Sequence, residues 1–418
     1  MAKITAISSH EEANTSSSPR KPAKRAPPPS PPPPVSLFIW LIPTLTVAFS
    51  IYCNYRGMQA TPHGWFHDLM STSPTALRSQ AGLPRSFHQS LDDLPRPFDR
   101  ILLVLDLFFV QAAATSLGKG LVAIMASIAL PWFVAELIEG LKVGQRRAPL
   151  GIEGFALIVI IAGVYMFGCV IPLVSVPAMA IYGWRQATKK PSVIRPLPSP
   201  DASVVQAVVL NVAISGLPIL GLLLIDAQSY PVLAFYNNIG AVLFPLAWFP
   251  LLILRSRSGS TKHRKHVDPR LAASNAYRLL AYLTIPAWWG GGYVAIPQLL
   301  RIIRGSTAQW PDDATSLLFW DICGLLAGAY ALVLVQAEVD FRAVQCGGPR
   351  VHRARLLVED IVFGSTGLLL LGPGFAFSMY LARREVLAEK ARFGVAPAFV
   401  EEAEKLDGEF KAEAQKAQ

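Results

Sequence analysis

A run of apolar residues from Leu121 to Ile138, interrupted by one charged side chain at Glu136, most limits how this chain can fold. A helix of this length comes close to the thickness of a bilayer's hydrocarbon core, which is about 30 Å. Similar runs recur along the chain, in which 52% of residues are hydrophobic and 16% are charged. Together with a mean hydropathy of +0.39, they predict an all-α, polytopic transmembrane helical bundle.

The apolar runs predict about nine spans and divide the chain into three parts. Residues 1–34, which are basic and rich in proline, cannot bury a core and predict a disordered tail. Residues 35–382 form the predicted transmembrane domain, and residues 383–418 form a charged amphipathic tail. The strongest basic clusters follow alternate runs, so the positive-inside rule predicts an integral membrane protein with a cytoplasmic N-terminus.

Glycine and proline predict where the runs are interrupted. Gly118-Lys119-Gly120 is expected to connect the second run to the third, and Gly290-Gly291-Gly292 to break the seventh. Pro172 and Pro177 are expected to kink or break the fourth run. A ninth crossing is expected from about Leu356 to Leu381.

Acidic side chains inside the apolar runs are the strongest chemical signal. Glu136 and Glu139 stand three residues apart, which places them on one face of a helix. Asp106 lies near the middle of the second run, and Asp321 lies near the start of the eighth. A carboxylate in lipid is costly, so these four residues are the predicted catalytic residues. The alternative for Asp106 is a hydrogen bond between helices.

Aromatic and amide side chains in the same runs are predicted to bind substrate. The two tryptophans that precede Gly290 suit a flat ligand, although an aromatic belt at the membrane interface uses the same residue types. The predicted substrate-binding residues are Phe109, Trp132, Phe133, Tyr236, Asn238, Trp288, Trp289 and Trp320.

Several chemistries lack their sequence signals. The chain has no Walker loop, no dinucleotide fingerprint, no histidine boxes and no serine elbow. Its four cysteines are not spaced as metal ligands, and Asp92-Asp93 and Asp312-Asp313 do not complete the Asp-Asp-x-x-Asp motif that holds magnesium diphosphate. No metal and no cofactor are therefore predicted. The net charge of +10 lies in the tail and loops, which argues against a nucleic-acid partner.

Buried carboxyl groups among aromatic rings suit proton-initiated cyclisation of a polyene or an epoxide. A carboxyl group that stays protonated can deliver the proton, and aromatic faces can stabilise the resulting carbocation. A transporter would use the same acids as proton relays, and a non-catalytic scaffold would pair them with arginine or amides. Acids that converge on one aromatic pocket favour the cyclase, a path between both faces favours transport, and dispersal favours the scaffold.

The layout, with the Asp106 run followed by the run that ends in Glu139-Gly140, resembles the integral-membrane terpene cyclases of fungal meroterpenoid and indole-diterpene pathways. The smaller members use paired acids to protonate an epoxide, and this longer chain is more similar to the ascofuranone and ascochlorin type. The resemblance covers residues 98–382 in layout. It implies an endoplasmic reticulum membrane, a farnesyl- or geranylgeranyl-type epoxide as the lipid-like prenylated substrate, and membrane lipids and pathway enzymes as partners.

Overall fold

The protein is described by a computed structural model that covers residues 38–60, 68–69, 71–80, 82, 96–140, 167–187, 202–210, 269–305, 310–344 and 366–392. Within these ranges the regular elements are all helices, and no strand occurs. The prediction of an all-α protein is therefore confirmed for the part of the chain that the structure describes. The prediction of a disordered tail falls on residues 1–34, which lie outside these ranges.

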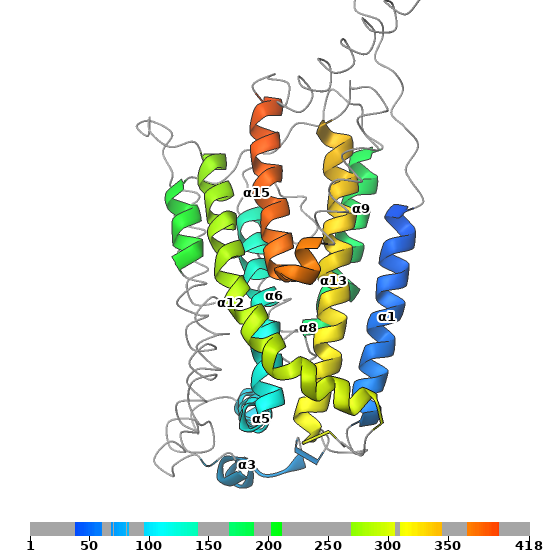
Figure 1. Ribbon diagram of the computed structural model, residues 1–418, viewed down its shortest axis with the longest axis vertical. Coiled ribbons are helices and arrows are strands. Elements are labelled where there is room, and N and C mark those ends of the chain that lie inside the picture. Colours follow the sequence, from blue (N-terminus) through cyan, green and yellow to red (C-terminus); the bar gives the residue numbers. More distant parts are fainter. Residues whose placement is uncertain are drawn as a thin grey trace, which may run out of the picture. The chain divides into compact units, whose positions relative to one another are not determined.

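Six long helices carry most of the described residues (Figure 1). They are α1 (Phe38–Ala60), α5 (Arg96–Ala114), α6 (Ser116–Gly140), α12 (Pro269–Ile303), α13 (Asp313–Val344) and α15 (Pro373–Arg392). Three segments are long and apolar enough to cross a membrane, namely Ser116–Glu139, Leu271–Ile303 and Asp313–Gln336. Membrane-spanning helices are therefore supported, whereas the count of about nine spans stays a prediction because part of it falls outside the described ranges.

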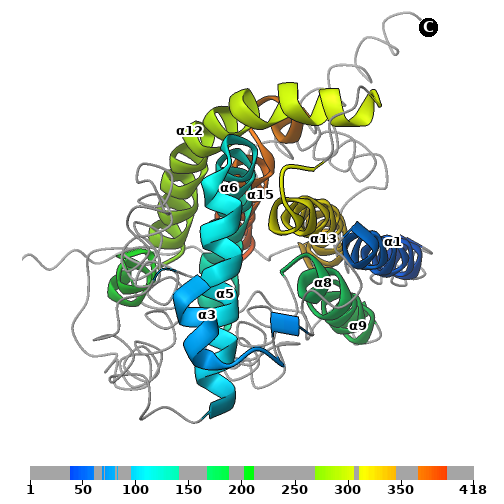
Figure 2. The same ribbon diagram turned by 90° about the horizontal axis from the view of Figure 1, so that it is seen from below.

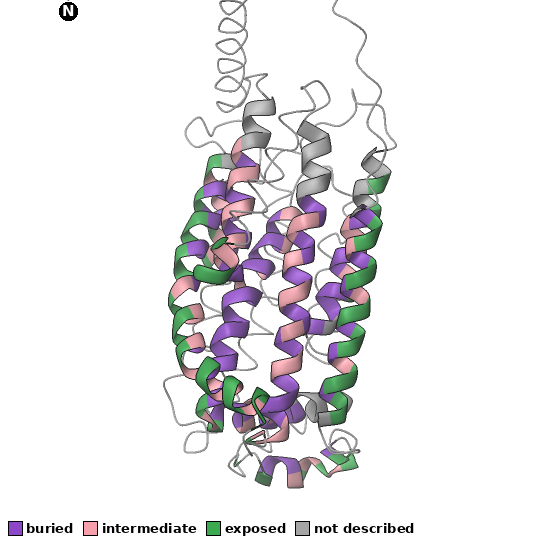
Figure 3. Ribbon diagram, turned by 45° about the vertical axis from the view of Figure 1, so that its right-hand side comes forward, coloured by how far each residue is buried: buried purple, intermediate pink, exposed green. Residues whose placement is uncertain are grey.

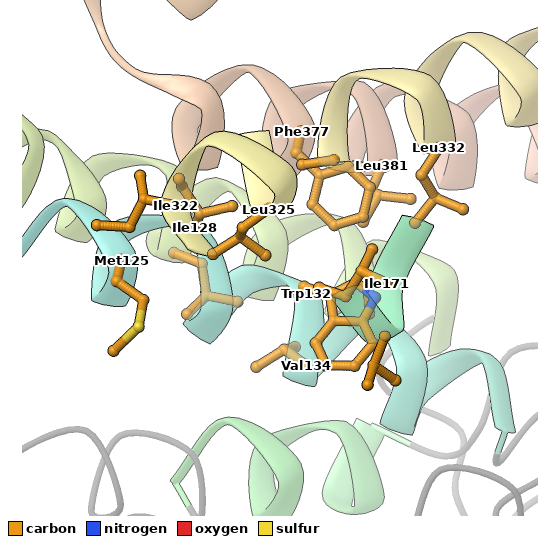
Figure 4. Close-up of a cluster of buried hydrophobic side chains, with 14 of the residues drawn as sticks. Met125, Ile128, Trp132, Val134, Ile171, Ile322, Leu325, Leu332, Phe377 and Leu381 are labelled. Carbon is orange, nitrogen blue, oxygen red and sulfur yellow. The ribbon is translucent and has the colours of Figure 1, made fainter. Parts of the chain in front are cut away.

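Two groups of helices meet at α13. On one side α12 packs along both α6 and α15, and on the other side α13 packs against α1, α8 (Phe167–Val170) and α9 (Val176–Ala187) (Figure 2). Buried side chains from α6, α13 and α15 interlock between them, including Ile128, Leu325 and Phe377 (Figure 4). The core of the described part is therefore an apolar interior shared by several helices.

Exposed apolar side chains cover the outward sides of α1 and α12. Leu45 and Ile51 of α1 are exposed, as are Leu283 and Tyr293 of α12. Figure 3 shows exposed positions in green on the outer helices and buried positions in purple on the inward sides. An outer surface of this composition suits lipid, which agrees with the length of the apolar helices.

The start of α6 corrects one expectation. The Thr115 Oγ1 atom accepts a hydrogen bond from the Gly118 N–H at 3.0 Å, and the Thr115 carbonyl accepts one from the Lys119 N–H at 2.9 Å. Thr115 is thus the N-cap that separates α5 from α6. Gly118 to Gly120 consequently lie inside α6, and the prediction that they connect two runs is wrong.

The three glycines of α12 do not break it, because packing against α6 holds the helix together. Gly120 of α6 faces Gly291 of α12, and a Cβ added at either residue would lie within 2.8 Å of the carbonyl oxygen of the other. Small residues at such crossings let two helix backbones approach closely. α12 therefore runs without interruption from Pro269 to Ile303, and the expected break is wrong.

Proline in the fourth run widens the helix instead of ending it. A π-helical turn, η1 (Ile171–Ser175), joins α8 to α9, and the Val176 N–H donates to the Ile171 carbonyl oxygen. Pro172 has no N–H to donate, and its ring lies against Gly328 of α13, where an added Cβ would be 2.8 Å from Pro172 Cγ. The extra residue in this turn absorbs the effect of the proline.

α15 begins halfway along its neighbours rather than at their ends (Figure 1). Gly372 has φ +95°, a left-handed conformation that ends the preceding turn, and Pro373 is the first residue of α15. Gly374 then lies against Ser127, the midpoint of α6, and Thr284, near the midpoint of α12. The expected crossing from Leu356 to Leu381 is therefore interrupted. α15 also continues past residue 382, the expected end of the transmembrane domain.

Pro131 explains why α15 meets α6 at this point. Because Pro131 has no N–H, the carbonyl oxygen of Ser127, four residues earlier in α6, lacks its helical hydrogen bond. The backbone of Gly374 closes over this oxygen, and a Cβ at position 374 would overlap it. A Cα–H group is a weak donor, so the contact compensates the oxygen in part.

Candidate functional site

The helix crossings fix which residues are level with one another. Gly120 faces Gly291, and two helical turns further Ser127 and Thr284 both contact Gly374. α6 and α12 are thus antiparallel and stay in register over two turns. Two more turns in the same direction place Tyr277 of α12 level with the segment of α6 that carries Glu136 and Glu139.

Glu139 is held in an ion pair. Arg384 Nη1 donates to Glu139 Oε1 at 2.7 Å, and Nη2 donates to Oε2 at 3.3 Å. The two side chains are 16% and 18% exposed, so water screens the pair only in part. A bidentate arginine–carboxylate contact of this kind fixes both orientation and charge. The carboxylate of Glu139 is therefore fixed against a cation on α15.

Glu136 lies one turn before Glu139, next to the aromatic side chain of Trp132. Its carboxyl group interacts with the Trp132 side chain and lies within electrostatic range of Glu139. Trp132 is 1% exposed, and its ring centroid is 5.2 Å from that of Phe133. Three predicted site residues, Glu136, Trp132 and Phe133, are thus brought together. In this position the carboxyl group of Glu136 can exchange a proton beside aromatic rings.

Tyr277 and Glu385 complete the site and were not predicted from the sequence. Tyr277 is 0% exposed, and within the described part of the chain its hydroxyl has no hydrogen-bond partner. Its charged neighbours come from α6 and α15. Ser274, one turn earlier, donates to the Ala382 carbonyl at 3.0 Å and ties α12 to α15. We call the following residues the polar cluster: Glu136, Glu139, Tyr277, Arg384 and Glu385.

Asp321 lies apart from the polar cluster. It is 7% exposed and accepts a hydrogen bond at 2.5 Å from the Gly168 N–H in the first turn of α8. Ser50 of α1 donates to the Gly168 carbonyl at 3.0 Å. Asp321 therefore joins α13 to α8 beside α1. Its carboxylate serves as a hydrogen-bond acceptor between helices.

Trp320 packs against α1, and Phe109 of α5 packs against the hydrophobic core. Trp320 makes an edge-to-face contact with Tyr52 at 6.0 Å, and the Arg56 guanidinium lies 5.4 Å from its ring centroid. Phe109 makes an edge-to-face contact with Phe108 at 5.2 Å. Trp320 thus packs against α1, away from the polar cluster.

The two tryptophans of α12 point in different directions. Trp288 packs against the backbone of Gly372, just before α15, whereas Trp289 is 58% exposed on the outer side of α12. Asp106 belongs to α5, but its side chain lies outside the described part. Tyr236 and Asn238 also lie outside the described ranges.

The site is therefore a carboxyl group beside aromatic rings, with a fixed anion and a buried hydroxyl nearby. Among the described residues, no group of three or more His, Cys, Asp or Glu is placed to hold a metal ion. No family model, curated protein or solved structure matches the chain. The function is therefore argued from the residues of the polar cluster.

Proposed function

We propose that the protein is a membrane-bound terpene cyclase that catalyses proton-initiated cyclisation of an epoxidised or polyene prenyl chain, with Glu136 as the acid. The observation that carries the proposal is the position of the Glu136 carboxyl group against the buried ring of Trp132, one turn from the ion pair of Glu139 and Arg384. Aromatic faces stabilise a carbocation, and an apolar site keeps water from quenching it.

The proposed reaction is an isomerisation and needs no co-reactant. Glu136 transfers its proton to the epoxide oxygen or to a terminal alkene carbon, and the C–O or π bond breaks to leave a carbocation. The π electrons of the next double bond form the new C–C bond. The last cation loses a proton, which returns to the Glu136 carboxylate directly or through another carboxylate of the polar cluster, so the acid is regenerated and protons balance over the cycle. Arg384 keeps Glu139 anionic throughout.

A microsomal assay tests this proposal. The full chain is expressed in a host without related pathways and given an epoxyfarnesyl chain attached to an aromatic acceptor, and product is followed by mass spectrometry and NMR. Glu136→Gln should abolish product at an unchanged protein level, because an amide cannot deliver the proton. Asp321→Asn is the matched control, since it removes the buried acid of α13 but keeps an oxygen acceptor for the Gly168 N–H.

Transport of a metabolite is the second candidate, and the start of α15 favours it. A helix that begins at the middle of the bundle, after the left-handed Gly372, is typical of the discontinuous helices at transporter binding sites. If wild-type microsomes form no product from several epoxyprenyl and polyene substrates, the cyclase proposal fails. Export of prenylated metabolites from cells that express the chain is then the assay. The location in the endoplasmic reticulum, with a cytoplasmic N-terminus, belongs to the same proposal.

A further inference from the structure

We infer that the Tyr277 hydroxyl donates a hydrogen bond to a neutral oxygen atom on a long apolar ligand bound where α6, α12 and α15 meet. The inference rests on the proposed function, because it assigns Tyr277 to the same substrate that Glu136 protonates. It adds a recognition residue and a ligand chemistry to that site.

The side chain of Tyr277 is directed into this junction by the helical repeat. Tyr277, Thr284 and Gly291 recur every seven residues along α12, so they share one face. Gly291 contacts α6 and Thr284 contacts Gly374 of α15, which shows where that face points. Tyr277 is 0% exposed, so water does not reach its hydroxyl from outside.

The Tyr277 hydroxyl is a buried hydrogen-bond donor that lacks an acceptor in the described part of the chain. Within the described part of the chain it makes no hydrogen bond, and a buried hydroxyl without a partner is costly. Its charged neighbours are Glu136, Glu139 and Glu385 together with Arg384. With Glu136 carrying its proton, as the proposed function requires, two further carboxyl groups face one guanidinium, which disfavours an anionic ligand. A neutral ether, epoxide, hydroxyl or carbonyl oxygen is the acceptor that fits.

Ser378 provides a comparison inside the same junction. Ser378 lies one turn after Gly374 on α15, so it shares the face that contacts Ser127 and Thr284. Its side chain is 0% exposed, and its hydroxyl also has no hydrogen-bond partner in the described part. It lies two turns before Glu385 on α15 and is not a member of the polar cluster. Ser378 is therefore a matched control for the loss of a buried hydroxyl.

Equilibrium binding to the full chain in nanodiscs tests the inference without requiring turnover. Quenching of tryptophan fluorescence is titrated with farnesyl methyl ether, which offers an acceptor oxygen, and with farnesene, the hydrocarbon without it. One neutral hydrogen bond should make wild type bind the ether roughly tenfold more tightly than the hydrocarbon. Tyr277→Phe, which keeps the ring, should reduce that preference to about onefold, and Ser378→Ala should leave it at the wild-type value.

The outcomes separate this inference from the proposed function. If wild type shows no preference for the ether, or Tyr277→Phe keeps it, the inference is refuted whether or not product forms in microsomes. If wild type prefers the ether through Tyr277 but forms no product, the binding site stands and the cyclase proposal fails. If Ser378→Ala removes the preference as fully as Tyr277→Phe, the preference arises from packing, which also overturns the inference.

Discussion

Replacing Gly374 with alanine should destabilise the protein, because the added Cβ has no room. An ideal Cβ at this position overlaps the carbonyl oxygen of Ser127 and lies 3.2 Å from Thr284 Cβ. One obstacle is backbone and the other is the first side-chain atom of a β-branched residue, so neither can rotate away. The start of α15 must therefore move away from α6 and α12.

The size of the effect follows from two opposing terms. Overpacking by a methyl group costs roughly 1–3 kcal/mol, and the upper value applies here because the obstacle is backbone. Alanine also lowers the entropy of the unfolded chain and improves helix propensity, which returns about 0.5–1 kcal/mol. The net expectation is a loss of about 2 kcal/mol in the free energy of unfolding of Gly374→Ala.

Equilibrium unfolding in mixed detergent micelles, followed by tryptophan fluorescence, measures this loss. Gly290→Ala is the matched control, since a Cβ at position 290 meets nothing within 4 Å and the residue is exposed. It should stabilise α12 by up to about 1 kcal/mol through helix propensity alone. The packing argument is refuted if Gly374→Ala is as stable as wild type. It is also refuted if Gly290→Ala loses as much stability as Gly374→Ala.

Three further changes test other contacts by the same unfolding measurement. Arg384→Met should cost about 3 kcal/mol in the free energy of unfolding by leaving Glu139 without its cation, and adding Glu139→Gln should recover part of that loss. If the single and the double variant lose the same stability, the unpaired charge of Glu139 is not the cause of the loss. Asp321→Asn should cost under about 1 kcal/mol, whereas Asp321→Ala should cost about 2 kcal/mol by leaving the Gly168 N–H unpaired; similar values would contradict the acceptor role. Gly120→Val should separate α6 from α12 and cost about 3 kcal/mol, and a neutral result would contradict the close crossing.

The pattern of hydrophobic residues predicted the positions of the long apolar helices. The apolar runs that begin near residues 121, 276 and 316 correspond to α6, α12 and α13, because burial in lipid or in a bundle needs the same apolar side chains. The spacing along the helix placed Glu136 beside Trp132 and one turn from Glu139, because neighbours on one helix face are set by the helical repeat alone.

Contacts between segments that are far apart in the sequence could not be predicted from this pattern. Arg384 is 245 residues from Glu139, and nothing in either segment indicates the other. The role of Asp321 depends on the Gly168 N–H, which lies in the first turn of α8. The sequence does not show which backbone N–H groups lack a partner within their own helix. The predictions from glycine were wrong in both α6 and α12. Helix propensity includes only the free energy that glycine costs within its own helix, and it omits the close crossing of two helices that glycine permits.

The position at which α15 begins determines which residues of α15 reach the polar cluster. Arg384 follows Gly374 by ten residues, a rise of about 15 Å, and Glu139 follows Ser127 by twelve residues, about 18 Å. The remaining difference of about 3 Å is within the reach of an arginine side chain. If α15 instead began level with Ser116 at the start of α6, Arg384 would lie well short of Glu139. The left-handed turn at Gly372 and the contact of Gly374 with α6 therefore set the height at which Arg384 meets Glu139. A change at position 374 should accordingly weaken the ion pair as well as the packing.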